Sequence, residues 1–258
     1  MKNVLGLIFF IICSMILGCT NNYSIQKFKT PHDSSQTYKS YIIKRPFGDV
    51  KIINASYSMF SAIKRDFYSA PLAAQFSVSK IRISHDQEDK DFKDGGGAHF
   101  HTDSKHMRIK FSGYIPHLIL PSGEICINLE YCNGLLRHEM SHSQVYFWKI
   151  QLKEIGEISK WKYLYRFWEL ENKKEYPKNG FLYRYATKNE DEEAAGIVSA
   201  ISNFFFNLQD PYTGAPHGFF GIDKKDDRYL KKVEAVHKLG LTTKLEHQKI
   251  IELFKEPR

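Results

Sequence analysis

Residues 133–148 read NGLLRHEMSHSQVYFW, and here the apolar positions change from strand-like alternation to helical spacing. The residues that share the helical spacing are Leu135, Leu136, Met140, Val145, Tyr146 and Trp148. We therefore predict a mostly buried helix from Leu135 to about Leu152, preceded by a turn at Asn133-Gly134.

Inside this helix, His138-Glu139-Met140-Ser141-His142 forms an HExxH motif. Four residues of helix advance about 6 Å and turn about 40° beyond a full turn, so both imidazoles project from one face toward a common ion. Zinc, bound by nitrogen at about 2.0–2.1 Å, fits such a pair. Glu139 lies beside them, where a general base deprotonates the water that attacks a carbonyl. The alternative is two histidines on an ordinary amphipathic helix.

Strand patterns dominate the residues before the motif. The predicted elements are a helix at 57–68, a strand at 76–84, a loop at 85–97, and strands at 107–111 and 125–129. The last strand follows a turn predicted at Pro121-Ser122-Gly123, and a change of parity predicts a bulge or a turn near Lys80. The motif helix therefore follows an edge-type strand.

Helical patterns dominate the residues after the motif. The predicted helices are residues 158–170, 190–208, 225–239 and 243–254, with a break at Gly240 between the last two. Strands first and helices afterwards predict an α+β fold with a helical C-terminal half.

A catalytic zinc site needs a third protein ligand and an open fourth position. His142 is followed by Ser143-Gln144-Val145-Tyr146, so the extended HExxHxxGxxH motif of metzincins is excluded. The remaining option is a glutamate on a later helix. Residues 185–195, YATKNEDEEAA, open such a helix about 50 residues downstream.

These two motifs resemble the gluzincin-type zincin peptidases, in particular the catalytic domain of anthrax lethal factor. The likeness lies in HExxH at His138–His142 and in a Tyr-x-x-x-Asn-Glu-x-Glu stretch at Tyr185, Asn189, Glu190 and Glu192. It implies a zincin-like fold, in which a small mixed sheet with an edge strand is followed by the active-site helix. It also implies zinc-dependent hydrolysis of peptide bonds.

The resemblance assigns a role to two residues of the second motif. Glu192 becomes the third zinc ligand, and Tyr185 donates a hydrogen bond to the oxyanion that forms as water adds to the peptide carbonyl. The family usually carries a further glutamate four residues after its ligand, which supports the metal site, and this chain has Gly196 there. Asp191 and Glu193 are the candidates to replace that glutamate.

Each of these residues also has a purely structural interpretation. Asn189 and Glu192 have the spacing of a helix capping box, which by itself explains an acidic first turn. Glu193 is a rival third ligand. Tyr185 is alternatively an ordinary buried tyrosine whose hydroxyl finds a partner.

Another histidine cluster, His99, His101 and His106, precedes the predicted strand at 107–111. An alternating histidine pair can bind a metal, but we interpret these residues as part of a loop. Arg137, next to the motif, is predicted to be a charge on the helix surface.

The N-terminal residues predict a bacterial lipoprotein. Residues 1–18 have a positive Lys2 and a short apolar run, and they lead into Cys19 as a lipobox does. We expect a signal peptide at 1–18, a lipidated Cys19 with a polar tether at 19–39, and a folded domain at 40–258. The alternative is an uncleaved anchor helix. Either predicts an extracytoplasmic protein held at the cell envelope, on the outer membrane or the cell surface.

The charge limits which binding partners the sequence predicts, and the cysteine content limits the possible disulfides. Without residues 1–18 the chain has 36 basic and 29 acidic residues, a net charge of +7. No basic run or aromatic-basic module accompanies this excess, so nucleic acid is excluded as a partner. Cys126 and Cys132 remain as thiols that form a disulfide in an oxidising compartment or stay buried and free.

Three functions follow from these patterns. The first is a membrane-anchored zinc metalloprotease, a hydrolase of proteins or peptides that requires Glu139. The second is a non-catalytic lipoprotein that uses the zincin scaffold to bind a protein or envelope partner. The third is a structural or scavenging metal site, closed by a fourth ligand from residues 99–106.

Overall fold

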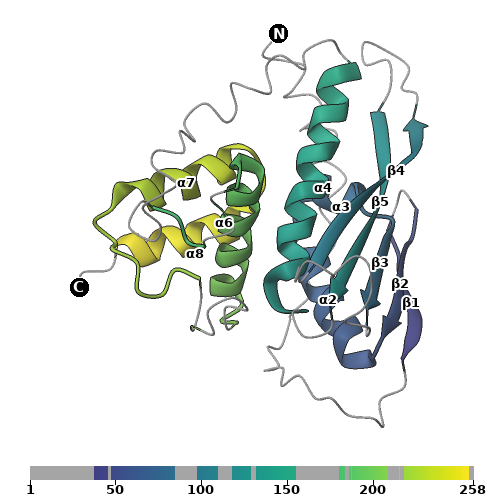
Figure 1. Cartoon of the computed structure of the whole chain (residues 1–258), viewed down its shortest axis with the longest axis horizontal. Helices are drawn as coiled ribbons and strands as arrows, with labels where there is room; N and C mark the ends of the chain where they lie inside the picture. Colours follow the sequence, from purple (N-terminus) through teal and green to yellow (C-terminus); the bar gives the residue numbers. More distant parts are fainter. Residues whose placement is uncertain are drawn as a thin grey trace. The chain divides into compact units, whose positions relative to one another are not determined.

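The computed structural model divides the chain into two units, Met1–Pro31 and His32–Arg258. The structure describes part of the second unit (Figure 1). The described residues are 38–45, 48–84, 98–109, 118–128, 132–154, 180–183, 186, 188–208, 215 and 218–255. The predicted leader, Cys19, most of the tether, the 85–97 loop and the 158–170 helix lie outside them.

The strands form one mixed sheet in the order β1-β2-β3-β5-β4. Their bounds are β1 Lys39–Ile43, β2 Val50–Ala55, β3 Lys80–Ser84, β4 Ala98–Ile109 and β5 Leu118–Asn128. Strands β2, β3 and β5 run parallel, and β1 and β4 pair antiparallel at the two edges. With the helices described below, this sheet confirms the α+β class.

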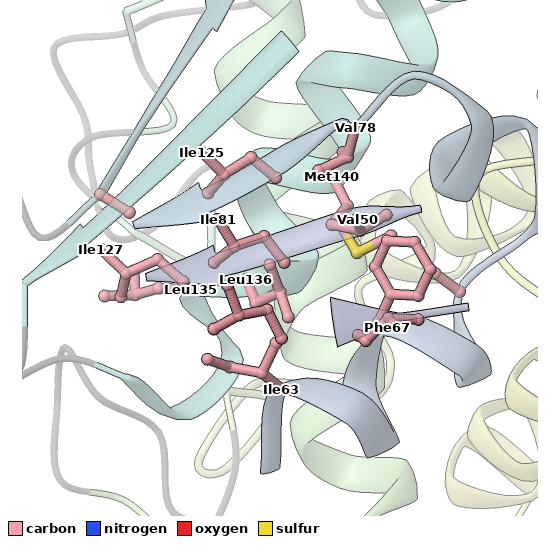
Figure 2. Close-up of a cluster of buried hydrophobic side chains, with 14 of the residues drawn as sticks. Val50, Ile63, Phe67, Val78, Ile81, Ile125, Ile127, Leu135, Leu136 and Met140 are labelled. Carbon is pink, nitrogen blue, oxygen red and sulfur yellow. The ribbon is translucent and has the colours of Figure 1, made fainter. Parts of the chain in front are cut away.

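Helices from before and after β5 pack on one face of the sheet. Helix α2 spans Tyr57–Ser69, α3 spans Leu72–Phe76, and α4 spans Cys132–Glu154. Isoleucines alternate along β3 and β5, so each strand turns one row of apolar side chains toward the helices. Figure 2 shows the resulting core, in which the labelled residues are Val50, Ile63, Phe67, Val78, Ile81, Ile125, Ile127, Leu135, Leu136 and Met140.

The last three helices form a second core. Helix α6 spans Glu190–Phe205, α7 spans Asp227–Lys238, and α8 spans Lys244–Lys255, which agrees with the predicted helical half. The buried residues that join them are Ile197, Val198, Ile201, Val233, Val236, Ile250 and Leu253. Among the helices that the structure describes, none is long and apolar enough to cross a membrane.

Helices α4 and α6 run antiparallel in close contact. Near the start of α4, Gly134 has φ +78°, and a Cβ there would collide with the Asn203 side chain. The Ser199 hydroxyl donates a hydrogen bond to the Gly134 carbonyl over 2.9 Å. Lys149, near the other end of α4, meets Asp191 at the start of α6. Glycine at 134 therefore allows the approach that brings the first turn of α6 to the motif helix.

The turn predicted at Pro121-Ser122-Gly123 is wrong, because these residues lie inside β5. Thr102 pairs with Gly123 and His106 with Pro121, so three residues of β4 stand opposite one of β5. Such a bulge tolerates a proline that donates no hydrogen bond. Gly123 leaves room for the Phe100 ring to cross the strand.

Two further strand predictions need correction. The strand predicted from Phe76 begins at Lys80, because Phe76 ends α3 and packs against Phe147 of α4. The strand that precedes the motif helix, β5, is internal, and the edge strand is β4. The backbone of residues 99–106 belongs to β4 and not to a loop.

Arg137 is not the surface charge predicted from the sequence. Its side chain and that of Glu246 on α8 are each 1% exposed, and Arg137 Nη2 lies 3.1 and 3.2 Å from the two carboxylate oxygens. Glu246 also accepts hydrogen bonds from the Thr243 backbone and hydroxyl, so Thr243 and Glu246 form a capping box for α8. This buried pair joins α8 to the motif helix.

We expect Glu246→Gln to lower the free energy of unfolding by about 3 kcal/mol, because it removes the negative charge that lies against the buried Arg137 guanidinium. Urea denaturation followed by circular dichroism measures the change. Glu252→Gln, at an exposed position of the same helix, is the matched control and should stay within about 0.5 kcal/mol of the parent chain. Equal effects of the two changes would contradict the assignment.

Candidate metal centre

Two histidines of α4 converge on one point. His138 and His142 are one helical turn apart, and their rings lie nearly perpendicular, 77° between planes, with centroids 4.9 Å apart. This orientation brings the two Nε2 atoms to 3.2 Å. The convergence predicted from the i,i+4 spacing of HExxH is therefore present.

Glu192 reaches the histidine pair from the first turn of α6. Asn189 is the N-cap, and its Oδ1 accepts a hydrogen bond from the Glu192 backbone N–H over 2.9 Å. The Glu192 carboxylate turns away from the cap, and its Oε2 lies 3.2 Å from His138 Nε2 and 3.3 Å from His142 Nε2. The capping contact therefore leaves the Glu192 side chain free to act as a ligand, because the cap uses only its backbone N–H.

The three ligand atoms form a nearly equilateral triangle with sides of 3.2–3.3 Å. A tetrahedral ion with bonds of about 2.0–2.1 Å holds its ligand atoms about 3.3–3.4 Å apart, so the triangle matches three corners of such a site. The group His138, His142 and Glu192 can hold a metal ion. Among the residues that the structure describes, none supplies a fourth ligand atom to this group.

Burial is uneven around the triangle. The side chain of His138 is 6% exposed, whereas those of Glu192 and His142 are 17% and 20% exposed. The described surroundings therefore leave the centre more accessible from the side of Glu192 and His142. A metal centre that accepts a substrate needs such an approach.

Contacts among the candidate ligands shift the pKa values of Glu192 and His142. Burial alone would raise the pKa of the Glu192 carboxyl, but its bonds to His138 and His142 hold that pKa well below the ordinary range. Burial lowers the pKa of His142, yet the bond to Glu192 and the charges of Glu139 and Asp191 raise that pKa above its ordinary value. The Glu192 carboxylate is therefore held in its ionised form, which a cation needs, and a metal ion would have to displace the proton that these contacts favour on His142.

Glu139 is buried on the motif helix, 5% exposed, and it is not one of the three grouped ligands. Its charge acts on His142, which places it near the centre. A carboxylate at this place can take a proton without occupying a coordination position.

The rival ligand Glu193 points elsewhere. Its buried carboxylate pairs with Lys232 of α7, while Asp191 pairs with Lys149 of α4 over 3.0 Å. The Glu193 alternative is therefore wrong, and neither acid is hydrogen-bonded to the histidine pair within the described part of the chain. Neither lysine was predicted from the sequence, although Lys149 follows His142 by seven residues on one helix face.

One candidate ligand lacks a supporting contact from the described residues. His138 Nδ1 is buried and has no hydrogen-bond partner among the described residues. The second ring nitrogen of a metal-binding histidine ordinarily donates to a carboxylate, a carbonyl or water. At Gly196, where the resembling family has its supporting glutamate, a Cβ would lie 3.2 Å from the Tyr183 ring. This site therefore differs from the family pattern at that point.

Several predicted residues lie outside the described part of the structure. They are Tyr185, Cys19 and the side chains of His99, His101, His106, Cys126 and Cys132. Their roles stay predictions.

We expect the purified full chain to hold about one metal ion, and His142→Ala and Glu192→Ala each to weaken binding more than the roughly 10- to 100-fold that loss of a supporting residue costs. Each change removes one corner of the triangle. Elemental mass spectrometry after dialysis against metal-replete buffer measures the content. Glu190→Ala, an exposed acid in the same helical turn, should retain the ion. Loss of metal in that control, or none in the parent, would contradict the assignment.

Comparisons with known proteins found no relative of this chain. No family model, no curated protein and no solved structure matches the chain.

Proposed function

We propose that this chain is a zinc-dependent peptidase carried on an envelope lipoprotein. The observation that carries the proposal is the triangle of His138 Nε2, His142 Nε2 and Glu192 Oε2, with sides of 3.2–3.3 Å and Glu139 buried beside it. Three protein ligands with an open fourth position are typical of catalytic zinc sites, whereas structural sites are closed by four.

The donor set favours zinc. Two imidazole nitrogens and one carboxylate oxygen suit a borderline ion, and calcium or magnesium would prefer an all-oxygen shell of higher coordination number. Zinc also has no redox chemistry, which suits hydrolysis. The spacing of the ligand atoms supports this choice because it agrees with tetrahedral bond lengths.

Each residue then has a defined task. A bound zinc ion supplies Lewis acidity that polarises water and the scissile carbonyl. Glu139 takes the proton of the attacking water and returns it to the leaving amine. Tyr185, by resemblance, donates to the developing oxyanion. His138, His142 and Glu192 hold the centre in place.

The edge position of strand β4 favours a protein or peptide as the substrate. It pairs with β5 on one side and ends the described sheet on the other, so its outer backbone groups can accept an extended peptide. Phe100 of β4 contacts Tyr146 of α4, with ring centroids 6.2 Å apart. Tyr146 is one turn after His142, so a peptide on β4 would run past the metal helix.

The location completes the proposal. Acylation of Cys19 would tether the domain to the membrane surface through residues 19–39, with the substrate among extracytoplasmic proteins. The net charge of +7 for the lipidated form is compatible with an anionic envelope surface.

A non-catalytic binding protein is the second candidate. It is favoured by the buried His138 Nδ1 without a described partner and by Gly196 in place of the supporting glutamate. Loss of such support commonly costs about 10- to 100-fold in metal affinity or activity. This candidate requires the surface of the domain but not Glu139.

We expect Glu139→Gln to keep zinc and to lower peptide cleavage about 100- to 10,000-fold, because the amide cannot take the proton from water. The measurement is cleavage of a randomised fluorogenic peptide library by the zinc-loaded chain, with zinc content determined in parallel. Glu190→Gln is the matched control with unchanged cleavage. A zinc-loaded parent chain that cleaves no peptide would favour the binding protein instead.

A further inference from the structure

Helix α6 begins with four consecutive acids, Glu190 to Glu193, and the middle of this run supplies the metal ligand. The three acids from Asp191 onward contact three different partners. Asp191 meets a lysine of α4, Glu192 meets the histidines of α4, and Glu193 meets a lysine of α7. The ligand is thus flanked on both sides by a carboxylate held by a cation.

The first flanking contact is made along the metal helix itself. Lys149 Nζ lies 3.0 Å from Asp191 Oδ2, and both side chains are a little over one third exposed. Lys149 is seven residues after His142, which is about 10 Å along the helix. Its contact therefore joins α6 to the same helix that carries both histidines, beyond the metal centre.

The second flanking contact is buried. Lys232 of α7 pairs with Glu193, and the two side chains are 16% and 2% exposed. The same ammonium group donates to the Gly180 carbonyl over 2.8 Å and lies 4.4 Å from the centroid of the Phe181 ring. The position of Lys232 is therefore itself determined by three separate contacts.

Helical geometry links these contacts to the ligand. Successive residues of a helix point about 100° apart, so restraining Asp191 and Glu193 restrains the rotation of the helix about its axis. That rotation decides where the Glu192 carboxylate points. Metal ligands need placement to about 0.5 Å, and support from neighbouring residues provides it.

We propose that Lys149 and Lys232 are positioning residues that hold Glu192 on the histidine pair by binding the carboxylates on either side of it. The proposal rests on the metal centre of the proposed function and not on peptidase activity. The ordinary alternative is two ion pairs that serve only the fold. A partly exposed pair such as Lys149 with Asp191 contributes little to stability in that case.

The direction in which the zinc dissociation constant changes distinguishes positioning residues from ion pairs that serve only the fold. Removing a lysine near a cation site should by charge alone tighten metal binding, because the repulsion between like charges falls. Positioning predicts the opposite, a zinc dissociation constant about 10-fold higher in Lys149→Met, similar to the loss of other supporting residues. The full chain is titrated with zinc alone against a chromophoric chelator.

The matched control is Lys231→Met, which removes the exposed pair of Lys231 with Asp227 on α7. It should leave the zinc dissociation constant unchanged. Lys232→Met should weaken zinc at least as much as Lys149→Met, and its thermal midpoint will also fall because Glu193 loses its buried partner. If Lys232→Met fails to fold, Lys149→Met still tests the proposal, because the pair of Lys149 with Asp191 is partly exposed and contributes little to stability.

A second background shows whether Lys149 acts through the ligand. In Glu192→Gln, the additional change Lys149→Met should no longer raise the zinc dissociation constant, because only the charge effect is left. An unchanged or tighter constant for Lys149→Met in the parent chain overturns the proposal, as does an equal loss in the Glu192→Gln background. If the parent chain binds no zinc, the metal centre is contradicted, and the two lysines then have no metal ligand to position.

Discussion

Helix α4 is buried on two sides at once, and the arrangement of the candidate metal ligands depends on this packing. Leu135, Leu136 and Met140 face the sheet core, while Val145 belongs to the core built with α6, α7 and α8. A helix covered from both sides shows no single apolar stripe. Both histidines and Glu139 can therefore sit on a rigid, mostly desolvated element, which is where ligands are best held in place.

Several buried polar residues of α4 have hydrogen-bond partners, which lowers the cost of burying them. The Ser141 hydroxyl donates to the Arg137 carbonyl one turn earlier, and the Ser143 hydroxyl donates to the Met140 carbonyl. The Gln144 amide donates to the carbonyl of Gly240, in the break between α7 and α8. These bonds satisfy groups that would otherwise destabilise the interior. They allow the polar sequence around HExxH to occupy a core helix.

Pairs of opposite charge join the helices around the centre. Arg137 and Glu246 join α4 to α8, and Lys232 and Glu193 join α7 to α6. A buried pair adds little net stability, but the loss of one partner is costly, so such pairs mainly restrict how the helices pack. The first turn of α6 is held in this way on the metal helix.

The amino-acid sequence by itself was sufficient to predict the features that depend on residues close together in the chain. The α+β class follows from the change of hydrophobic period, and the convergence of His138 and His142 follows from helical rotation over four residues. Both depend on neighbours in the chain, so a single sequence contains them. Tertiary packing decided the rest. Glu192 and Glu193 are chemically identical neighbours, and only the docking of α6 on α4 turns one to the histidines and the other to Lys232. Partners distant in sequence meet only when the core has formed, because burial of apolar faces sets the rotation of each helix.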